Sequence, residues 1–382
     1  MRHASIISFI QSLYGAKEVP LHAPVFLGKE EAYLRACIDS TFVSSIGEYV
    51  TRFEQAVAEY TGAKYAVATV NGTAALHTAL RLAGVDAGCE VITQSLTFVA
   101  TCNAISYLGA TPAFVDVEEA RYGMDPDSLA RFLRTRARRE GGRLVDRYSG
   151  RRIGAVVPMH TFGHPCRIDE IADICEAYGL PLIEDAAESL GSLYKGRHTG
   201  RFGKMGIFSF NGNKIVTAGG GGVLVTDDEA LARRARHLTT TAKVPHPYAY
   251  IHDEVGYNYR LPNLNAALAC AQMESIEKIV ANKRETARRY ADFFAEIPGV
   301  RWVDEPEEAR SNMWLNALCF HDPQEAEAFL AQSNAVGVMT RPVWRPMHRL
   351  PMYADAPAQA LPVTEKAAKR LVNIPSGYRS GA

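Results

Sequence analysis

The stretch Met205-Gly-Ile-Phe-Ser-Phe-Asn-Gly-Asn-Lys214, which is followed by a glycine run from Gly219, decides how the fold is interpreted. It predicts a short apolar strand at residues 207–210, a turn that carries Lys214, and a second strand at residues 222–226. Desolvation disfavours the charged form of an amine, and the neutral amine is what Schiff-base chemistry needs. A lysine that merely extends its ammonium to solvent explains this stretch equally well, so a second observation is needed.

The second observation lies upstream, in Leu180-Pro-Leu-Ile-Glu-Asp185, which predicts a buried parallel strand ending in two carboxylates. A carboxylate at the C-terminal end of such a strand faces the crevice in which open α/β sheets bind ligands. Asp185 and Lys214 together supply what pyridoxal phosphate requires, namely an amine for the aldehyde and an acid for the pyridine nitrogen.

The composition is that of a soluble globular protein. The chain has 382 residues, of which 47% are hydrophobic and 22% charged, so one large and one small domain are expected. The net charge is zero, which disfavours nucleic acid and acidic membranes as partners. No apolar run approaches the roughly 20 residues of a membrane span.

Cysteine and histidine usage argues against a metal site. The seven cysteines are scattered without a CxxC pair, which predicts free thiols in a reducing cytoplasm and no zinc. His160 and His164 have helical i, i+4 spacing, but Gly163 and Pro165 predict a loop there. The N-terminal residues 1–16 predict an amphipathic helix or arm and not a signal peptide.

Strand and helix patterns alternate along the first two thirds of the chain, which predicts parallel strands joined by right-handed crossovers. The expected strands are 64–70, 90–94, 112–117, 155–159 and 180–185, and the expected helices are 29–40, 48–60, 99–108, 168–178, one from Asp125 and an Asp-capped helix at 227–238.

Asn71-Gly-Thr-Ala74 follows the first strand and leads into a helix expected to start near Ala75. Such a turn exposes backbone N–H groups to an anion, although an ordinary Thr N-cap is the commoner explanation. The arginine-rich residues 134–152 lack interleaved aromatics, which favours a solvated helix end and surface loop over a nucleic-acid patch.

The last third predicts a small α/β domain. Residues 239–262 form a long connection of the kind that binds a ligand or packs on another subunit. Helical spacing then continues over 264–296 as one long helix between the domains. Further strands are expected near Val300, at 314–320 and at 338–340, with helices from Gln324 and Thr364. The expected division is an arm at 1–25, a large domain at 26–262 and a small domain at 263–382.

With the 71–74 turn, Asp185, Ser209 and Lys214 in this order, the chain resembles the sugar aminotransferases of the DegT/DnrJ/EryC1/StrS family from Gly28 to Pro375. The resemblance implies an α/β protein of PLP-dependent transferase fold type I (aspartate aminotransferase-like). This fold has a large, mostly parallel seven-stranded sheet domain and a smaller C-terminal α/β domain. The motifs that carry it are Asp185-Ala-Ala-Glu188, Phe208-Ser-Phe-Asn-Gly-Asn-Lys214 and Gly256-Tyr-Asn-Tyr-Arg-Leu-Pro262.

The resemblance also implies roles for single residues. Lys214 would hold the cofactor and move protons, Asp185 would pair with the pyridine nitrogen, and Glu188 would lie beside the ring hydroxyl. Phe98 would stack on the ring, although a core phenylalanine is the simpler explanation from the sequence. The phosphate ligands would be Gly72, Thr73, Ala74 and Ser209, with Asn258 reaching over from the other subunit of a homodimer.

A finer resemblance points to the branch that aminates C4 of nucleotide-linked 4-keto-6-deoxy-N-acetylhexosamines, on the routes to bacillosamine and legionaminic acid. It is carried by residues 160–165, 237–245 and 339–348, and it leaves UDP and GDP open. His164, Arg341 and His348 are the candidate substrate contacts, with a structural loop as the equal alternative for Arg341 and His348.

The function expected from this resemblance is a ping-pong transamination. L-glutamate would convert the cofactor to pyridoxamine phosphate, and the keto sugar would then take the amine. Alternatives are a 3-keto or perosamine-type 4-keto substrate, or a regulator that binds the cofactor without turnover. Relatives that act as dehydratases carry histidine where Lys214 stands, which argues against that chemistry.

Overall fold

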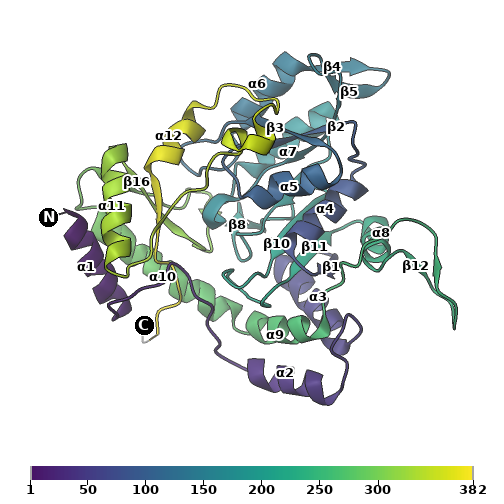
Figure 1. Ribbon diagram of the computed structural model, residues 1–382, viewed down its shortest axis with the longest axis horizontal. Coiled ribbons are helices and arrows are strands. Elements are labelled where there is room, and N and C mark those ends of the chain that lie inside the picture. The colour runs from purple at the N-terminus through teal and green to yellow at the C-terminus, as the bar shows by residue number, and fades with distance from the viewer. Residues whose placement is uncertain (1, 381–382) are drawn as a thin grey trace.

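A seven-stranded sheet forms the centre of the larger unit (Figure 1). The computed structural model describes residues 2–380, and the strand order is β1-β11-β10-β7-β6-β2-β3, with β7 and β6 joined by two parallel bridges. β11 is antiparallel to both neighbours, and the other neighbours are parallel. The mostly parallel sheet is therefore confirmed. Its strands are β1 (Tyr65–Thr69), β2 (Cys89–Gln94), β3 (Thr111–Val115), β6 (Arg152–Val157), β7 (Ile183–Asp185), β10 (Met205–Ser209) and β11 (Gly222–Thr226).

Helices cover this sheet, and several begin at a side-chain cap. Asn71 caps α4 by accepting from the Ala74 N–H, so the helix starts before the expected Ala75 and its cap is not a threonine. Asp228 caps α8, whereas Asp227 pairs with Arg201. The helices are α2 (Glu30–Asp39), α3 (Glu48–Thr61), α4 (Gly72–Leu82), α5 (Val99–Tyr107), α6 (Pro126–Arg136), α7 (Ile168–Tyr178) and α8 (Glu229–Thr239).

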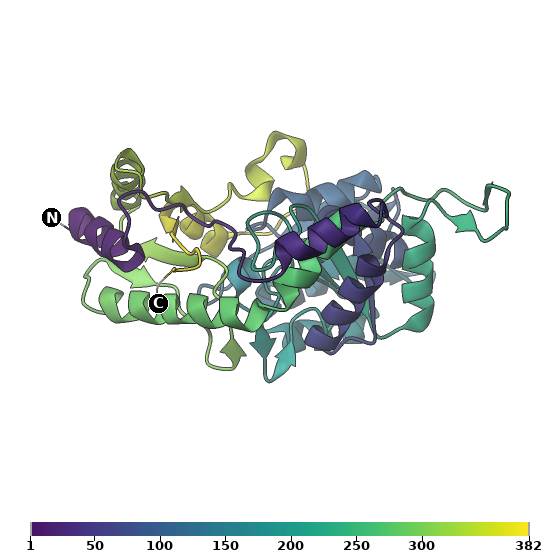
Figure 2. The same ribbon diagram turned by 90° about the horizontal axis from the view of Figure 1, so that it is seen from below.

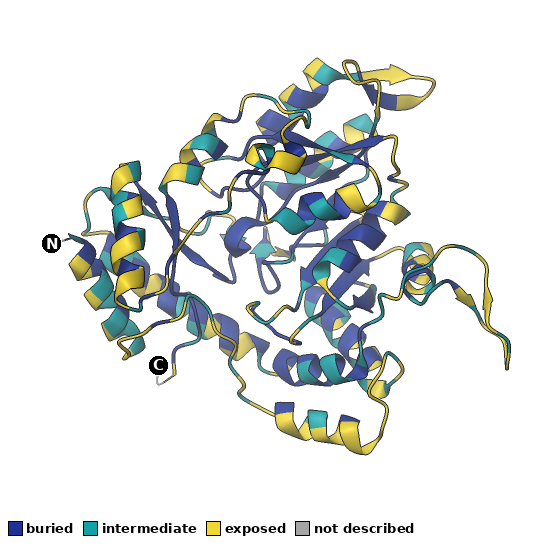
Figure 3. Cartoon of the chain, in the orientation of Figure 1, coloured by how far each residue is buried: buried dark blue, intermediate teal, exposed yellow. Residues whose placement is uncertain are grey.

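The strands are buried on both faces, as the dark central layer of Figure 3 shows. Every residue of β2 and β11 is buried. Continuous apolar runs of this kind are typical of parallel sheets sandwiched between helices. A polar side chain in the middle of such a strand would be buried and would need a partner. Groups that bind a ligand therefore lie where the strands end.

A second, antiparallel sheet with the order β14-β16-β18-β17 forms the smaller unit. Helix α1 packs on it, since Ile6 and Ile10 share a core with Phe294 and Phe329. The described part of the expected arm therefore contacts the smaller unit through α1 (Figure 1). Its elements are α1 (Arg2–Tyr14), β14 (Val300–Trp302), β16 (Asn316–Phe320), α11 (Pro323–Ala335), β17 (Arg341–Pro342), α12 (Pro362–Arg370) and β18 (Leu371–Ile374). The strand expected at 338–340 lies at β17 instead, and β18 was not predicted.

The expected single helix at 264–296 is two helices, α9 (Asn263–Met273) and α10 (Ile276–Phe294). The chain breaks at Glu274 and Ser275, where the Glu274 carboxylate pairs with Arg52 at 2.6 Å and Lys29 at 3.2 Å. Figure 2 shows α10 running from the larger unit along the smaller one, which agrees with the expected connecting role.

Two hairpins project from the larger unit (Figure 1), and Figure 2 shows the one that contains β12 from a second side. The arginine-rich segment 134–152 contains β4 (Ala137–Glu140) and β5 (Arg143–Asp146), where a loop was expected. The connection 239–262 contains β12 (Lys243–Val244) and β13 (Ile251–His252), and Tyr248 at its tip is 88% exposed. The short remaining elements are β8 (Leu193–Tyr194), β9 (Arg197–His198), β15 (Ala309–Arg310), η1 (Thr161–Gly163), η2 (Met347–Arg349) and η3 (Pro351–Tyr353).

Among the helices at residues 2–380, none combines the length and the apolar character that a membrane span requires.

Candidate active site

A cavity of about 730 Å³ lies beyond the C-terminal ends of β7 and β10, with walls from both units. The larger unit contributes Asp185, Lys214 and Phe98, and the smaller unit contributes Trp314 and Asn373. The sheet therefore brings the acid and the amine into one compartment, as the carboxyl-end rule for α/β sheets leads one to expect.

One end of the cavity is an anion cradle at the start of α4. Gly72, Thr73 and Ser209 all line it, and a Cβ placed on Gly72 would lie 3.1 Å from the Ser209 Cβ. Glycine thus lets the helix N-terminus approach the serine closely. Free N–H groups of a first helical turn, a serine hydroxyl and the positive end of the helix dipole favour a phosphate.

Asp185 is 6% exposed and ends β7. One of its oxygens accepts from the Thr101 hydroxyl at 2.7 Å and the other from the Ala187 N–H at 3.2 Å. These bonds fix the carboxylate at the cavity wall. A fixed, nearly buried carboxylate is suited to holding a proton on a heterocyclic nitrogen.

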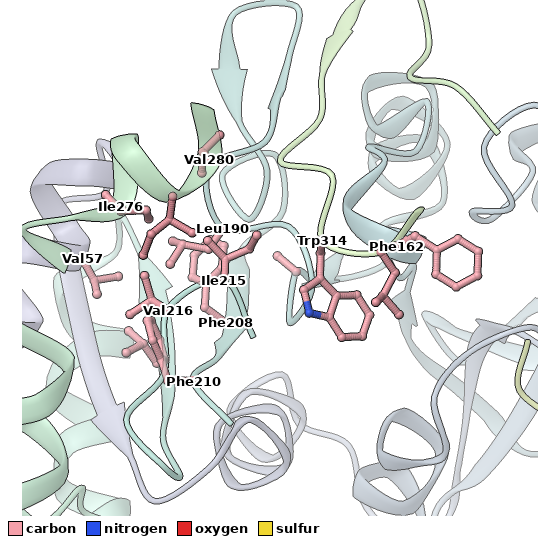
Figure 4. Packing of buried hydrophobic residues seen from close by; sticks show 14 of the residues in the cluster. Val57, Phe162, Leu190, Phe208, Phe210, Ile215, Val216, Ile276, Val280 and Trp314 are labelled. Carbon is pink, nitrogen blue, oxygen red and sulfur yellow. The ribbon is translucent and has the colours of Figure 1, made fainter. Parts of the chain in front are cut away.

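The Lys214 ammonium lies between two partners. Its Nζ is 3.6 Å from a Glu188 oxygen and 4.0 Å from the centre of a Trp314 ring. The Trp314 indole N–H donates to the Asn213 carbonyl at 2.7 Å, which ties the ring to the turn that carries the lysine. Figure 4 shows Trp314 between Phe162 and the part of the apolar cluster that contains Ile215. The amine is thus oriented before any ligand binds.

Glu188 is 3% exposed and accepts from the Phe162 N–H at 2.9 Å. Burial raises the pKa of Glu188 to about 7, against the opposing effect of the Lys214 ammonium. The carboxyl group therefore titrates near neutral pH beside the amine.

This shift predicts a pH-dependent stability. The raised pKa in the folded protein means that protonated Glu188 favours folding fully below pH 4.5, and this advantage is lost as the pH rises through 7. In the cofactor-free protein, Glu188→Gln should gain about 3 kcal/mol of unfolding free energy relative to the wild type between pH 4 and 8. Urea titrations across this range measure it. A constant difference would show that Glu188 titrates normally.

Phe98 immediately precedes α5 as its N-cap residue and is 49% exposed, which overturns the simpler explanation of a core phenylalanine. It lines the cavity and meets Trp344 edge to face, with 6.3 Å between the ring centres. An exposed aromatic face beside a carboxylate and an amine offers a stacking surface for a flat ring.

These groups fit pyridoxal phosphate. The cradle at Gly72 and Ser209 suits its phosphate, Phe98 its ring face, Asp185 its nitrogen and Lys214 its aldehyde. These four groups differ in chemistry, and each matches a different part of the same molecule.

Three predicted site residues do not line the cavity. Ala74 is not part of the cavity wall, and its N–H donates to the Asn71 side chain. His164 is fully buried outside the cavity, and burial lowers its pKa to about 4. The His348 ring bonds Ser95 and Glu365, both at 2.7 Å. None of these three residues lines the cavity, and the contacts expected for Ala74, His164 and His348 stay predictions.

Asn258 is exposed and lies outside the cavity of its own chain, next to the β12–β13 hairpin. Arg341 does line the cavity. The sequence interpretation missed Thr101, Trp314 and Asn373. Only Thr101 had a usable pattern, because it follows Phe98 by one helical turn.

Comparison with known proteins agrees with this geometry. The model of the DegT/DnrJ/EryC1/StrS aminotransferase family matches residues 27–379. The "Putative pyridoxal phosphate-dependent aminotransferase EpsN" of Bacillus subtilis (strain 168) is 39% identical over 94% of this chain and 91% of its own. The GDP-perosamine synthase of Escherichia coli O157:H7 is 35% identical over 94% and 93%.

Among solved structures, DesI, determined in the presence of its TDP-sugar product, has a TM-score of 0.82 at 29% identity. The match covers 95% of this chain and 90% of DesI. The sequence match and the fold extend over nearly the whole chain. This chain therefore belongs to the DegT/DnrJ/EryC1/StrS aminotransferase family.

Proposed function

We propose that this protein is a pyridoxal phosphate-dependent nucleotide-sugar aminotransferase. It would move an amino group from L-glutamate to C4 of a UDP- or GDP-linked 4-keto-6-deoxy-N-acetylhexosamine and give a 4-amino-4,6-dideoxy sugar nucleotide. The observation that carries the proposal is that Asp185 and Lys214 face one cavity with a phosphate cradle at its end. The names of the relatives EpsN and GDP-perosamine synthase support the reaction class.

Each part of the chain has a defined task in this reaction. When bound, pyridoxal phosphate supplies an aldehyde that accepts the amine and a ring that stabilises negative charge at the reacting carbon. Gly72, Thr73 and Ser209 would hold its phosphate, and Phe98 would support the ring face. Asp185, fixed by the Thr101 hydroxyl, would keep a proton on the ring nitrogen.

Lys214 would carry the proton between donor and acceptor atoms in both half-reactions. Its ammonium has Glu188 and the Trp314 face as neighbours, so the free side chain is restrained near the reacting carbon. Restraint of this kind lowers the entropic cost of each proton transfer.

A perosamine-type 4-keto sugar linked to GDP is the second candidate substrate. The relative named GDP-perosamine synthase is 35% identical, close to the 39% of EpsN. This similarity supports a perosamine-type substrate about as well as an N-acetylated one. A 3-keto sugar nucleotide remains a further alternative, and a regulator without turnover is much less favoured because Lys214 is present.

The deciding experiment offers the enzyme UDP- and GDP-linked 4-keto-6-deoxy-N-acetylglucosamine and the GDP-linked 4-keto-6-deoxyhexose, each with L-glutamate. Identification of the amino sugar by NMR gives the base, the position and the stereochemistry. We expect a 4-amino product from an N-acetylated sugar. Amination of only the GDP-linked hexose would instead establish the perosamine-type function.

We also propose a homodimer with shared sites, in which Asn258 reaches the phosphate of the neighbouring subunit. Asn258 is exposed beside a hairpin that projects from the body of the chain (Figure 2). Asn258 does not line the cavity of its own chain. A partner chain seated against this hairpin would place the Asn258 amide at the partner's cavity.

Mixed dimers test the shared site. A Lys214→Ala chain combined with an Asn258→Ala chain should recover about a quarter of the wild-type rate, because half of randomly paired symmetric dimers contain one complete site. The matched control pairs Lys214→Ala with Asp185→Ala, which stand in the same site and should give no recovery. Equal recovery in both mixtures, or none in either, would contradict a site built across the interface.

A further inference from the structure

A buried asparagine in the cavity wall has a side-chain nitrogen that no group of the described chain accepts from. Asn373 lies on β18, is 4% exposed and lines the cavity. Its side-chain nitrogen has no hydrogen-bond partner among residues 2–380. Buried polar groups are almost always paired, so an unpaired amide that faces a cavity indicates a ligand group at that position.

Arg341 adds positive charge beside this amide. It pairs directly with Asn373 across β17 and β18, so both side chains project from the same face of the sheet, and both line the cavity. The Arg341 guanidinium donates only to neutral oxygens, those of Asn334 at 2.9 Å and Thr340 at 2.8 Å. No carboxylate of the described chain pairs with it.

A buried lysine behind the wall adds part of a positive charge near neutral pH, because burial lowers the pKa of Lys283 to about 7. The Lys283 ammonium is 1% exposed and donates to the Ser376 carbonyl, and it has no ion-pair partner within the part of the chain that the structure describes. The Ser376 N–H donates to the Leu21 carbonyl at 2.7 Å, which brings the neighbouring His22 to the same region. Burial and then the charges of Lys283 and Lys214 lower the pKa of His22, which is therefore neutral. This wall favours an anion.

The burial of the Asn373 amide indicates which of the two substrates would place its anion there. In an α-amino acid the amine-bearing carbon carries its carboxylate directly, so this anion must lie as deep as the reacting carbon. In a keto sugar nucleotide the pyranose ring separates the keto carbon from the diphosphate, which therefore lies nearer the mouth. Asn373 is nearly fully buried, whereas Arg341 is exposed.

We propose that the amide of Asn373, with the positive charge of Arg341 beside it, binds the α-carboxylate of the amino donor. This assignment rests on the proposed transamination and adds a donor subsite to it. Asn373 touches the donor and is a specificity-determining residue.

A neutral amide also suits a cavity that two substrates enter in turn. In the second half-reaction the same position faces a neutral sugar, whose hydroxyl groups can accept from or donate to an amide. A buried arginine there would be left without an anion in that half-reaction, which is costly. The asparagine thus serves both substrates, and Arg341 at the exposed edge remains solvated.

The test uses Asn373→Asp in the holoenzyme and follows the two half-reactions separately by the cofactor absorbance. The added charge should repel the donor carboxylate, so kcat/KM for L-glutamate should fall about 100-fold or more, while the sugar half-reaction changes less than about 10-fold. Asn373→Ser, which shortens the side chain without adding charge, should lower the donor half-reaction about 10-fold. It keeps the test valid if the aspartate variant folds poorly.

Gln332→Glu is the matched control, because it adds the same charge on the exposed surface of α11 in the same unit. It should leave both half-reactions unchanged. A second readout needs no turnover. Glutarate, a dicarboxylate without an amine, should bind the borohydride-reduced holoenzyme in calorimetry, and Asn373→Asp should weaken this binding at least about 10-fold.

Several results would overturn the assignment. Unchanged glutarate binding in Asn373→Asp, an equal loss in both half-reactions, or a loss confined to the sugar half-reaction would each place the carboxylate elsewhere. The last of these would assign Asn373 to the sugar nucleotide. A wild-type enzyme that takes no amine from any α-amino acid would instead remove the proposed function, and the subsite with it.

Discussion

Lys214→Ala should abolish transamination. The Lys214 amine faces the cavity in which Asp185 also lies, and it is the sole lysine among the residues that line it in the described chain. In the proposed mechanism Lys214 would hold the cofactor and carry the proton, so its loss would remove both functions. We expect the rate to fall by at least about 10⁴-fold, the upper range for an acid–base group. Single-turnover absorbance with L-glutamate measures this.

Lys204→Ala is the matched control, because Lys204 is exposed on the segment that leads into β10 and lies outside the cavity. Its rate and its cofactor absorbance should equal those of the wild type. A small primary amine added to Lys214→Ala should restore part of the rate, since it can replace the missing proton carrier. A Lys214→Ala enzyme that transaminates at the normal rate would remove Lys214 from the mechanism.

The sequence predicts the part of the site that is built from strand ends. Asp185 and Lys214 follow short apolar runs that predict buried strands, and the rules of parallel sheets bring such strand ends to one edge. Gly72, Thr73 and Ser209 also lie at or just beyond strand ends, but their phosphate role was expected only from the family resemblance.

Apart from Arg341, the wall contributed by the smaller unit could not be predicted. Trp314 and Asn373 reach the cavity only because the smaller sheet packs against the larger unit, and no local pattern encodes this contact. Tertiary packing also explains why His164 and His348 do not line the cavity. His164 and His348 have sequences suited to a site, but tertiary packing buries the first and pairs the second with Ser95 and Glu365.

The break between α9 and α10 could not be predicted from the sequence either. The spacing of apolar residues continues across Glu274 and Ser275, so the pattern alone predicts one helix. At the break, Glu274 pairs with Lys29 and Arg52, which come from a distant part of the chain and which no local pattern encodes. Likewise, the arginine-rich segment forms the β4–β5 hairpin although its composition is that of a loop.

Asp185→Asn should have the second largest effect. Asparagine keeps the size of the side chain and can still accept from the Thr101 hydroxyl, but it carries no negative charge to hold a proton on the ring nitrogen. Loss of one member of a buried charged pair predicts a fall in the rate of about 10²- to 10³-fold. The rate of the glutamate half-reaction measures it, with cofactor content determined separately.

Thr101→Val separates the charge of Asp185 from its position. The variant keeps the shape of the side chain but removes the donor that lies 2.7 Å from the carboxylate, so the rate should fall only about 10-fold. In the Asp185→Asn background the same change should matter much less, because the carboxylate that the hydroxyl positions is already gone. If Thr101→Val were as damaging as Asp185→Asn, and the two losses multiplied in the double variant, the hydroxyl would act independently of Asp185. Wild-type turnover in Asp185→Asn would leave the ring nitrogen without the partner assigned to it.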